Sequence, residues 1–212
     1  MKVKFSRAQR AYCTLIFAHG AGAPMDSPFM ESMTQHLLGL GVSVVRFEFP
    51  YMAQRRVDGV RRPPNRMEVL QAHWREVYRY VQELSEEPIV LAGKSMGGRV
   101  ASMLADELQA SALICFGYPF YPARKPERPR IEHLQGLQTA TLIIQGERDA
   151  LGKQDTVEAY SLSPAIEFVW LAMADHDLKP LQRSGFTHEQ YLQRAAMRAA
   201  DFIQRSLAVK PR

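Results

Sequence analysis

Short apolar runs alternate along the chain with longer stretches in which apolar residues recur at helical spacing. The apolar runs predict strands at residues 15–18, 42–49, 89–92, 112–116, 141–145 and 166–171. The helical spacing predicts helices at residues 27–38, 66–84, 97–108 and 187–207. Because strands that alternate with helices favour βαβ units, we expect an α/β fold. It should be a three-layer sandwich with a mostly parallel sheet of six or seven strands.

Length and composition narrow the class of protein. The chain has 212 residues, of which 46% are hydrophobic, so we expect one globular domain over residues 1–212. No segment reaches the roughly 18 uncharged apolar residues of a membrane span, and no apolar stretch typical of a signal peptide follows the basic start. Cys13 and Cys115 lie in strand-like segments, which favours buried reduced thiols. We therefore expect a cytoplasmic protein without a membrane partner.

The net charge of +5 comes from 27 basic and 22 acidic residues. The basic residues concentrate in two loop-like stretches, at 55–66 and 124–130. Nucleic acid or an acidic substrate would suit such clusters. Neither zinc-ligand spacing nor an aromatic RNA-binding motif accompanies them, so we expect solvated loops, no nucleic-acid partner and no metal. The sequence leaves the oligomeric state open.

Residues 93–97, Gly-Lys-Ser-Met-Gly, follow the predicted strand at 89–92 and match two motifs. A phosphate-binding P-loop would need a glycine where Pro88 stands, and a flexible loop where the apolar strand lies. A nucleophile elbow, Gly-x-Ser-x-Gly, needs a strand before it and a helix after it. The sequence meets that requirement, so Ser95 is the candidate nucleophile. The alternative is that Ser95 has only a structural role, as the N-cap residue of a helix.

A serine nucleophile needs a base, and the base needs a carboxylate that orients it. Asp149 follows the predicted strand at 141–145, and His176 follows the strand at 166–171. Since the carboxyl ends of parallel strands meet at one edge, we expect both near Ser95. Glu147 is the alternative acid. The acids at 175 and 177 flank His176 in the sequence and are therefore less suited to face its imidazole ring. Asp155 is expected to cap a helix.

Backbone N–H groups that bind the oxyanion should come from two segments. Residues 19–24 form a glycine-rich turn after the first predicted strand, and we assign one donor to Ala21, with Gly22 as the alternative. The second donor is the N–H of Met96, just after the candidate nucleophile. We expect the ring of His19 to brace this turn rather than to act as a base.

Four segments together resemble the α/β-hydrolase superfamily: His-Gly-Ala-Gly at 19–22, Gly-Lys-Ser-Met-Gly-Gly-Arg at 93–99, Gly-Glu-Arg-Asp at 146–149 and Asp-His-Asp-Leu at 175–178. They are most similar to its small members without a cap, near the dienelactone-hydrolase-like branch. The resemblance implies an α/β-hydrolase fold, Ser95 as nucleophile, His176 as general base and acid, Asp149 as its orienting group, and no cofactor. The family's antiparallel N-terminal strands are hardly visible before residue 15, and only residues 118–138 could form a small lid.

The reaction expected from this resemblance is hydrolysis of a small-molecule ester or thioester through an acyl-enzyme on Ser95. Gly22 and Lys94 are the candidate substrate-binding residues. Lys94 could attract an anionic substrate, although we favour a structural pair with a carboxylate at the surface. Two alternatives remain: a catalytically idle hydrolase fold that serves as a binding or scaffold protein, and a peptidase with the same triad.

Overall fold

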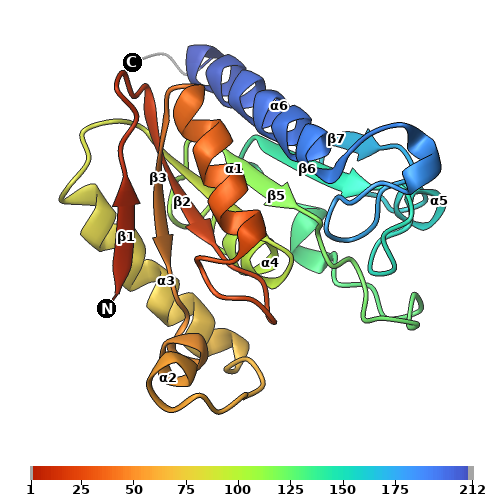
Figure 1. The fold of residues 1–212 in the computed structure, drawn as a ribbon, viewed down its shortest axis with the longest axis horizontal. Coiled ribbons are helices and arrows are strands. Elements are labelled where there is room, and N and C mark those ends of the chain that lie inside the picture. Colours follow the sequence, from red (N-terminus) through yellow and green to blue (C-terminus); the bar gives the residue numbers. More distant parts are fainter. Residues whose placement is uncertain (1, 210–212) are drawn as a thin grey trace.

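A computed structural model describes residues 2–209 (Figure 1). Seven strands form one sheet in the order β1-β3-β2-β4-β5-β6-β7. The strands are β1 (Val3–Ser6), β2 (Cys13–Ala18), β3 (Val42–Phe47), β4 (Ile89–Lys94), β5 (Leu113–Phe116), β6 (Thr141–Gly146) and β7 (Ile166–Leu171). Only β1 is antiparallel to its neighbour. The mostly parallel sheet expected from the apolar runs is confirmed.

Helices cover both faces of the sheet, which confirms the three-layer sandwich (Figure 1). They are α1 (Pro28–Gly39), α2 (Pro50–Asp58), α3 (Met67–Gln82), α4 (Met96–Ser102), α5 (Gln154–Val157) and α6 (His188–Val209), with 3₁₀ turns η1 (Glu132–Leu134) and η2 (Gln182–Ser184). Helices α1 and α6 pack together on one face, and α3 and α4 on the other. No helix within residues 2–209 is long and apolar enough to cross a membrane.

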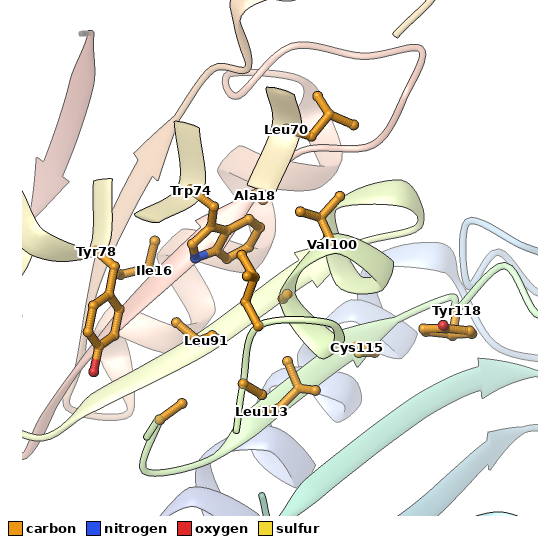
Figure 2. Packing of buried hydrophobic residues seen from close by; sticks show 14 of the residues in the cluster. Ile16, Ala18, Leu70, Trp74, Tyr78, Leu91, Val100, Leu113, Cys115 and Tyr118 are labelled. Atoms are coloured by element: carbon orange, nitrogen blue, oxygen red, sulfur yellow. The ribbon is translucent and has the colours of Figure 1, made fainter. Parts of the chain in front are cut away.

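Successive side chains of each strand point to opposite faces of the sheet, which divides the core into two clusters. In β2, Leu15 faces the cluster under α1 and α6, while Ile16 faces the cluster under α3 and α4. Trp74 of α3 is fully buried in the latter cluster with Leu91 and Val100 (Figure 2). Truncation of such a residue costs about 3–5 kcal/mol of stability. The two clusters hold the sheet rigid between its helices, and the sheet fixes the segments at its carboxyl edge.

The structure corrects three expectations about the elements. A strand does precede residue 15: β1 is short and only partly buried, so its signal is weak, and pairing with β3 holds it in place. The stretch at 55–66 is not all loop, because α2 contains Arg55 and Arg56; with only two buried residues it lacks an apolar stripe. The helix expected at 97–108 ends at Ser102 and continues as turns.

Both cysteines are buried and free, as expected. Cys13 lies in β2 and Cys115 in β5. Burial raises the pKa of the Cys13 thiol to about 12, so it stays protonated at neutral pH. Neither thiol is therefore a candidate nucleophile.

Candidate active site

Ser95 stands on a sharp turn between β4 and α4, with φ 54° and ψ −118°. This backbone region costs a non-glycine residue about 1–3 kcal/mol, which the surrounding fold must offset. Glycine is required on both sides of the turn. A Cβ on Gly93 would lie 2.1 Å from the backbone of Gly97, and one on Gly97 would lie 2.6 Å from the carbonyl oxygen of Ala18. The turn therefore has the local geometry of a nucleophile elbow, rather than that of an ordinary capped helix.

The structure brings Ser95, His176 and Asp149 into one chain of hydrogen bonds. The distance from Ser95 Oγ to His176 Nε2 is 2.8 Å, and from His176 Nδ1 to Asp149 Oδ2 it is 2.7 Å. Because a carboxylate only accepts, Nδ1 carries the ring proton, and Nε2 is left to accept the hydroxyl proton of Ser95. This arrangement lets the imidazole take that proton when Ser95 attacks a carbonyl carbon.

Asp149 is completely buried, and its carboxylate is held by two further donors. The backbone N–H of Leu151 donates to Oδ1 at 2.8 Å, and the side-chain amide of Gln145 donates to Oδ2 at 2.8 Å. These bonds offset the cost of burying the charge and fix the carboxylate toward the imidazole. Gln145, at the end of β6, was not singled out from the sequence, because its role depends on a loop that folds back onto it.

The other candidate acids point elsewhere. Glu147 accepts a hydrogen bond from the backbone N–H of Met173 at 2.8 Å. Asp175 accepts from the backbone of its own loop, at 2.9 Å from the Asp177 N–H. The expectation that Asp155 caps a helix is wrong: Lys153 is the N-cap of α5, and Asp155 lies within its first turn. Asp149 alone among these acids contacts His176.

Lys94 forms the favoured structural pair with an exposed carboxylate, but the lysine itself is buried beside the candidate nucleophile. Its ammonium donates to the carbonyl oxygen of His176 at 2.9 Å and pairs with Asp177 at 3.1 Å. It also lies 5.5 Å above the ring of Phe29. Burial lowers the pKa of Lys94, and the charge of Asp177 partly opposes that effect. The lysine thus ties the loop that carries His176 to strand β4.

The ring of His19 braces the glycine-rich turn, as expected. Its Nδ1–H donates to the carbonyl oxygen of Gly20 at 2.7 Å, and its Nε2 accepts from the N–H of Phe49 at 3.2 Å. Burial lowers its pKa, which agrees with a neutral ring that uses one nitrogen as donor and the other as acceptor. The Tyr51 hydroxyl adds a bond to the carbonyl oxygen of Ala21 at 3.0 Å. Tyr51, in α2, was missed from the sequence because that helix was not predicted.

A cavity of about 290 Å³ opens beside Ser95. Its walls include the proposed substrate-binding residues Gly22 and Lys94, together with Ala21 and His176. Phe29 and Met30 at the start of α1 add an apolar wall that the sequence did not reveal. Of the two predicted oxyanion donors, Ala21 is on the cavity wall, and Met96 follows Ser95 at the start of α4.

A larger cavity of about 710 Å³ lies at the other edge of the sheet, before β5, β6 and β7. Its lining contains none of the residues singled out for chemistry. Volume alone would have placed the site there. The converging hydroxyl, imidazole and carboxylate place it at the carboxyl edge of the strands instead, where parallel α/β sheets bind ligands.

Fold and geometry thus define a protein built like an α/β hydrolase, with a serine elbow at the sheet edge. The family model for the alpha/beta hydrolase domain matches residues 11–204, and the chain belongs to this family. Its fold is similar to that of a serine hydrolase without a lid from Xanthomonas campestris, with 21% identity over 99% of this chain and 90% of that one and a TM-score of 0.72.

Two further solved structures are similar over nearly the whole chain. A dienelactone hydrolase from Anabaena variabilis has 19% identity over 96% of this chain and 90% of that one, with a TM-score of 0.73. An alpha-beta serine hydrolase homologue from Coxiella burnetii has 22% identity over 97% and 90% of the two chains, with a TM-score of 0.69. At these identities the likeness supports the fold. The family resemblance drawn from the sequence motifs is confirmed.

Proposed function

We propose that the protein is a serine hydrolase that cleaves a small carboxylic ester or thioester through an acyl-enzyme on Ser95. One observation carries the proposal: the unbroken hydrogen-bond chain from Ser95 through His176 to the buried Asp149. A hydroxyl gains nucleophilic strength only if a base accepts its proton, and the base works best in one tautomer. An idle scaffold would need neither of these two contacts.

The reaction proceeds in two halves. Ser95 Oγ attacks the carbonyl carbon while its proton passes to His176 Nε2, and the N–H groups of Met96 and Ala21 stabilise the oxyanion. The imidazolium, stabilised by Asp149, then gives its proton to the leaving alcohol or thiol. A water molecule next loses a proton to His176, attacks the acyl carbon, and releases the acid as the proton returns to Ser95. Side chains and water supply every step, so the proposed reaction needs no cofactor.

The cavity favours a small acyl group. About 290 Å³ is near the lower end of ligand pockets in proteins. The apolar wall of Phe29 and Met30 suits a short carbon chain, while Gly22 lets the substrate approach the turn closely. We further propose that residues 1–212 work as one domain without a large cap, so that a substrate reaches Ser95 directly. The free, buried thiols favour a reducing compartment, the cytoplasm.

The proposal is tested with p-nitrophenyl acetate and butyrate, an acetyl thioester and a matched p-nitroanilide. We expect hydrolysis of the oxygen esters and the thioester, with little turnover of the anilide. Ser32→Ala is the control for loss of a serine hydroxyl, because Ser32 lies on α1 and bonds Glu189 at 2.9 Å, away from the cavity. Turnover of the anilide at the rate of the esters would identify a peptidase instead, and turnover that survives Ser95→Ala would refute the mechanism.

A further inference from the structure

Two arginines close to the elbow have no anionic partner. Arg99 lies in α4, and Arg130 immediately precedes the segment that leads into η1. Within the part of the chain that the structure describes, neither guanidinium forms an ion pair or a hydrogen bond, and Arg99 Nε is buried without a partner. Two other arginines have carboxylate partners. The buried Arg46 pairs with Glu31 at 2.9 Å, although its Nε likewise has no partner, and the guanidinium of Arg56 contacts Glu48 at 2.6 Å.

The groups around these arginines are held in place by one another. The Ser102 hydroxyl donates to the carbonyl oxygen of Arg99 at 2.8 Å, and the Tyr118 hydroxyl donates to that of Arg130 at 3.1 Å. Each hydroxyl has one proton, so both must act as acceptors toward His133 Nε2, which lies 2.8 Å from Ser102 Oγ and 3.3 Å from the Tyr118 oxygen. His133 Nε2–H therefore joins α4 to the segment that carries Arg130.

The cluster carries two positive charges and no negative one. Burial, followed by the charge of Arg99, lowers the pKa of His133 to about 4, so its ring is neutral at pH 7. Burial, followed by the charge of Arg99, also lowers the pKa of Arg130. Like charges that have no anion near them raise the free energy of the folded protein. An anionic group placed between them would relieve that cost and accept their charge-assisted hydrogen bonds.

The backbone of the cluster also adjoins the candidate catalytic residues. The N–H of Arg99 donates to the Ser95 carbonyl oxygen at 3.1 Å, and one helical turn separates the two residues, a rise of about 6 Å. Tyr118 follows Gly117, where an added Cβ would lie 2.6 Å from the carbonyl oxygen of His176. The first segment thus begins at Ser95, and the second passes close to the backbone of His176.

We propose that Arg99 and Arg130 form a binding site for an anionic group, a carboxylate or a phosphate, on the substrate that Ser95 attacks. This inference rests on the proposed serine hydrolase function and narrows its substrate class to anionic esters or thioesters. The exposed residues Arg124 and Lys125 add positive potential in the same segment, which would speed the approach of such a substrate at low salt.

The first test compares two esters that differ in one charge: p-nitrophenyl butyrate and mono-p-nitrophenyl succinate, which ends in a carboxylate. In Arg99→Gln and, independently, in Arg130→Gln, KM for the succinate ester should rise about tenfold, because one charge-assisted contact is lost. Both kcat and KM for p-nitrophenyl butyrate should stay unchanged. Arg128→Gln is the matched control, because it removes the same charge from an exposed residue of the same segment. Equal effects on both esters, or an equal effect of Arg128→Gln, would overturn the proposal.

The second test does not depend on turnover. Inorganic phosphate and succinate, added separately at constant ionic strength, should raise the Tm of the wild-type protein and not that of Arg99→Gln or Arg130→Gln. The anion that gives the larger shift distinguishes a phosphate site from a carboxylate site. No shift with either anion overturns the anion site, and a shift without any KM change overturns its link to the substrate. If neither ester is hydrolysed by the wild type but the Tm shift is present, the hydrolase function fails and the anion site stands.

Discussion

The two edges of the sheet differ in what they offer a ligand. At the amino edge, the cavity of about 710 Å³ has charged groups that are already satisfied within the protein. Glu167 pairs with Arg205 at 3.1 Å, and the carboxylate of Asp106 accepts the hydroxyl proton of Thr139 at 2.6 Å. These contacts stabilise the surface, and neither carboxylate orients an imidazole as Asp149 does.

At the carboxyl edge, a cavity less than half as large contains groups that are poised to react. The hydroxyl of Ser95 faces His176 Nε2, and the ring is fixed from its other side by Asp149. The comparison teaches that convergence of a nucleophile, a base and a buried acid identifies the site, and that cavity volume does not. Variants at the two edges test that contrast.

Replacing the base should abolish turnover, whereas a change at the amino edge should not. In His176→Gln, kcat for p-nitrophenyl butyrate should fall by about a millionfold, because Ser95 loses its proton acceptor. Glu167→Gln should leave kcat within twofold of the wild-type value, since that residue lies on the larger cavity. Steady-state kinetics on both purified variants decide the point. A large loss in Glu167→Gln with activity retained in His176→Gln would move the site to the amino edge.

Replacing the buried acid should cost less than replacing the base. In Asp149→Asn, kcat should fall by about 10⁴-fold, because the amide no longer holds Nδ1 protonated and Nε2 free. Glu147→Gln is the matched control: it is the neighbouring acid, and it contacts the Met173 N–H rather than His176. Kinetics at saturating ester measure both effects. If the two variants lose activity equally, Asp149 has no special role.

Loosening the loop that carries His176 should have an intermediate effect. In Lys94→Met, the bond to the His176 carbonyl oxygen and the pair with Asp177 are both lost, so kcat should fall by about 100-fold through misplacement of the imidazole. Lys94→Arg should recover part of the rate, because it can still donate to that carbonyl oxygen. The Tm of each variant must be measured alongside. An unchanged kcat in a folded Lys94→Met variant would show that the contacts of Lys94 with the His176 loop are not needed for catalysis.

The smallest effect concerns stability and involves His133. Its pKa is lowered from 6.5 to about 4 in the folded protein, so the unfolded chain binds a proton that the folded protein does not. The stability that this neutral ring provides is therefore complete above about pH 6.5 and is lost as the pH falls toward 4. After a discount for solvent screening, the loss is about 1–2 kcal/mol. Urea unfolding at pH 7 and pH 5 should show a smaller pH dependence in His133→Gln; an identical dependence would contradict the assignment.

Residues that act from the ends of parallel strands could be found from the sequence. Ser95, Asp149 and His176 each follow a strongly apolar run, and the parallel arrangement brings those ends to one edge. The glycines around Ser95 left few other geometries for the turn. The order of strands and helices was likewise readable, because buried parallel strands are continuous apolar runs.

Features that depend on distant contacts could not be found in this way. Strand β1 is held by pairing with β3, and α2 has too few buried residues to give a helical pattern. Lys94 looked like a surface cation because nothing local shows that the His176 carbonyl oxygen will lie 2.9 Å from its ammonium. The unpartnered Arg99 was read only as part of the elbow motif, since the lack of an anion nearby is a property of the folded chain.

The most direct test of the central claim is covalent labelling of Ser95. The wild-type protein is treated with a fluorophosphonate probe, digested, and the modified residue identified by peptide mass spectrometry. We predict a single adduct on Ser95 Oγ, lost in Ser95→Ala and strongly slowed in His176→Gln, because both the hydroxyl and its base are needed for attack on phosphorus. An unlabelled wild-type protein, or an adduct on another residue that survives Ser95→Ala, would contradict the account.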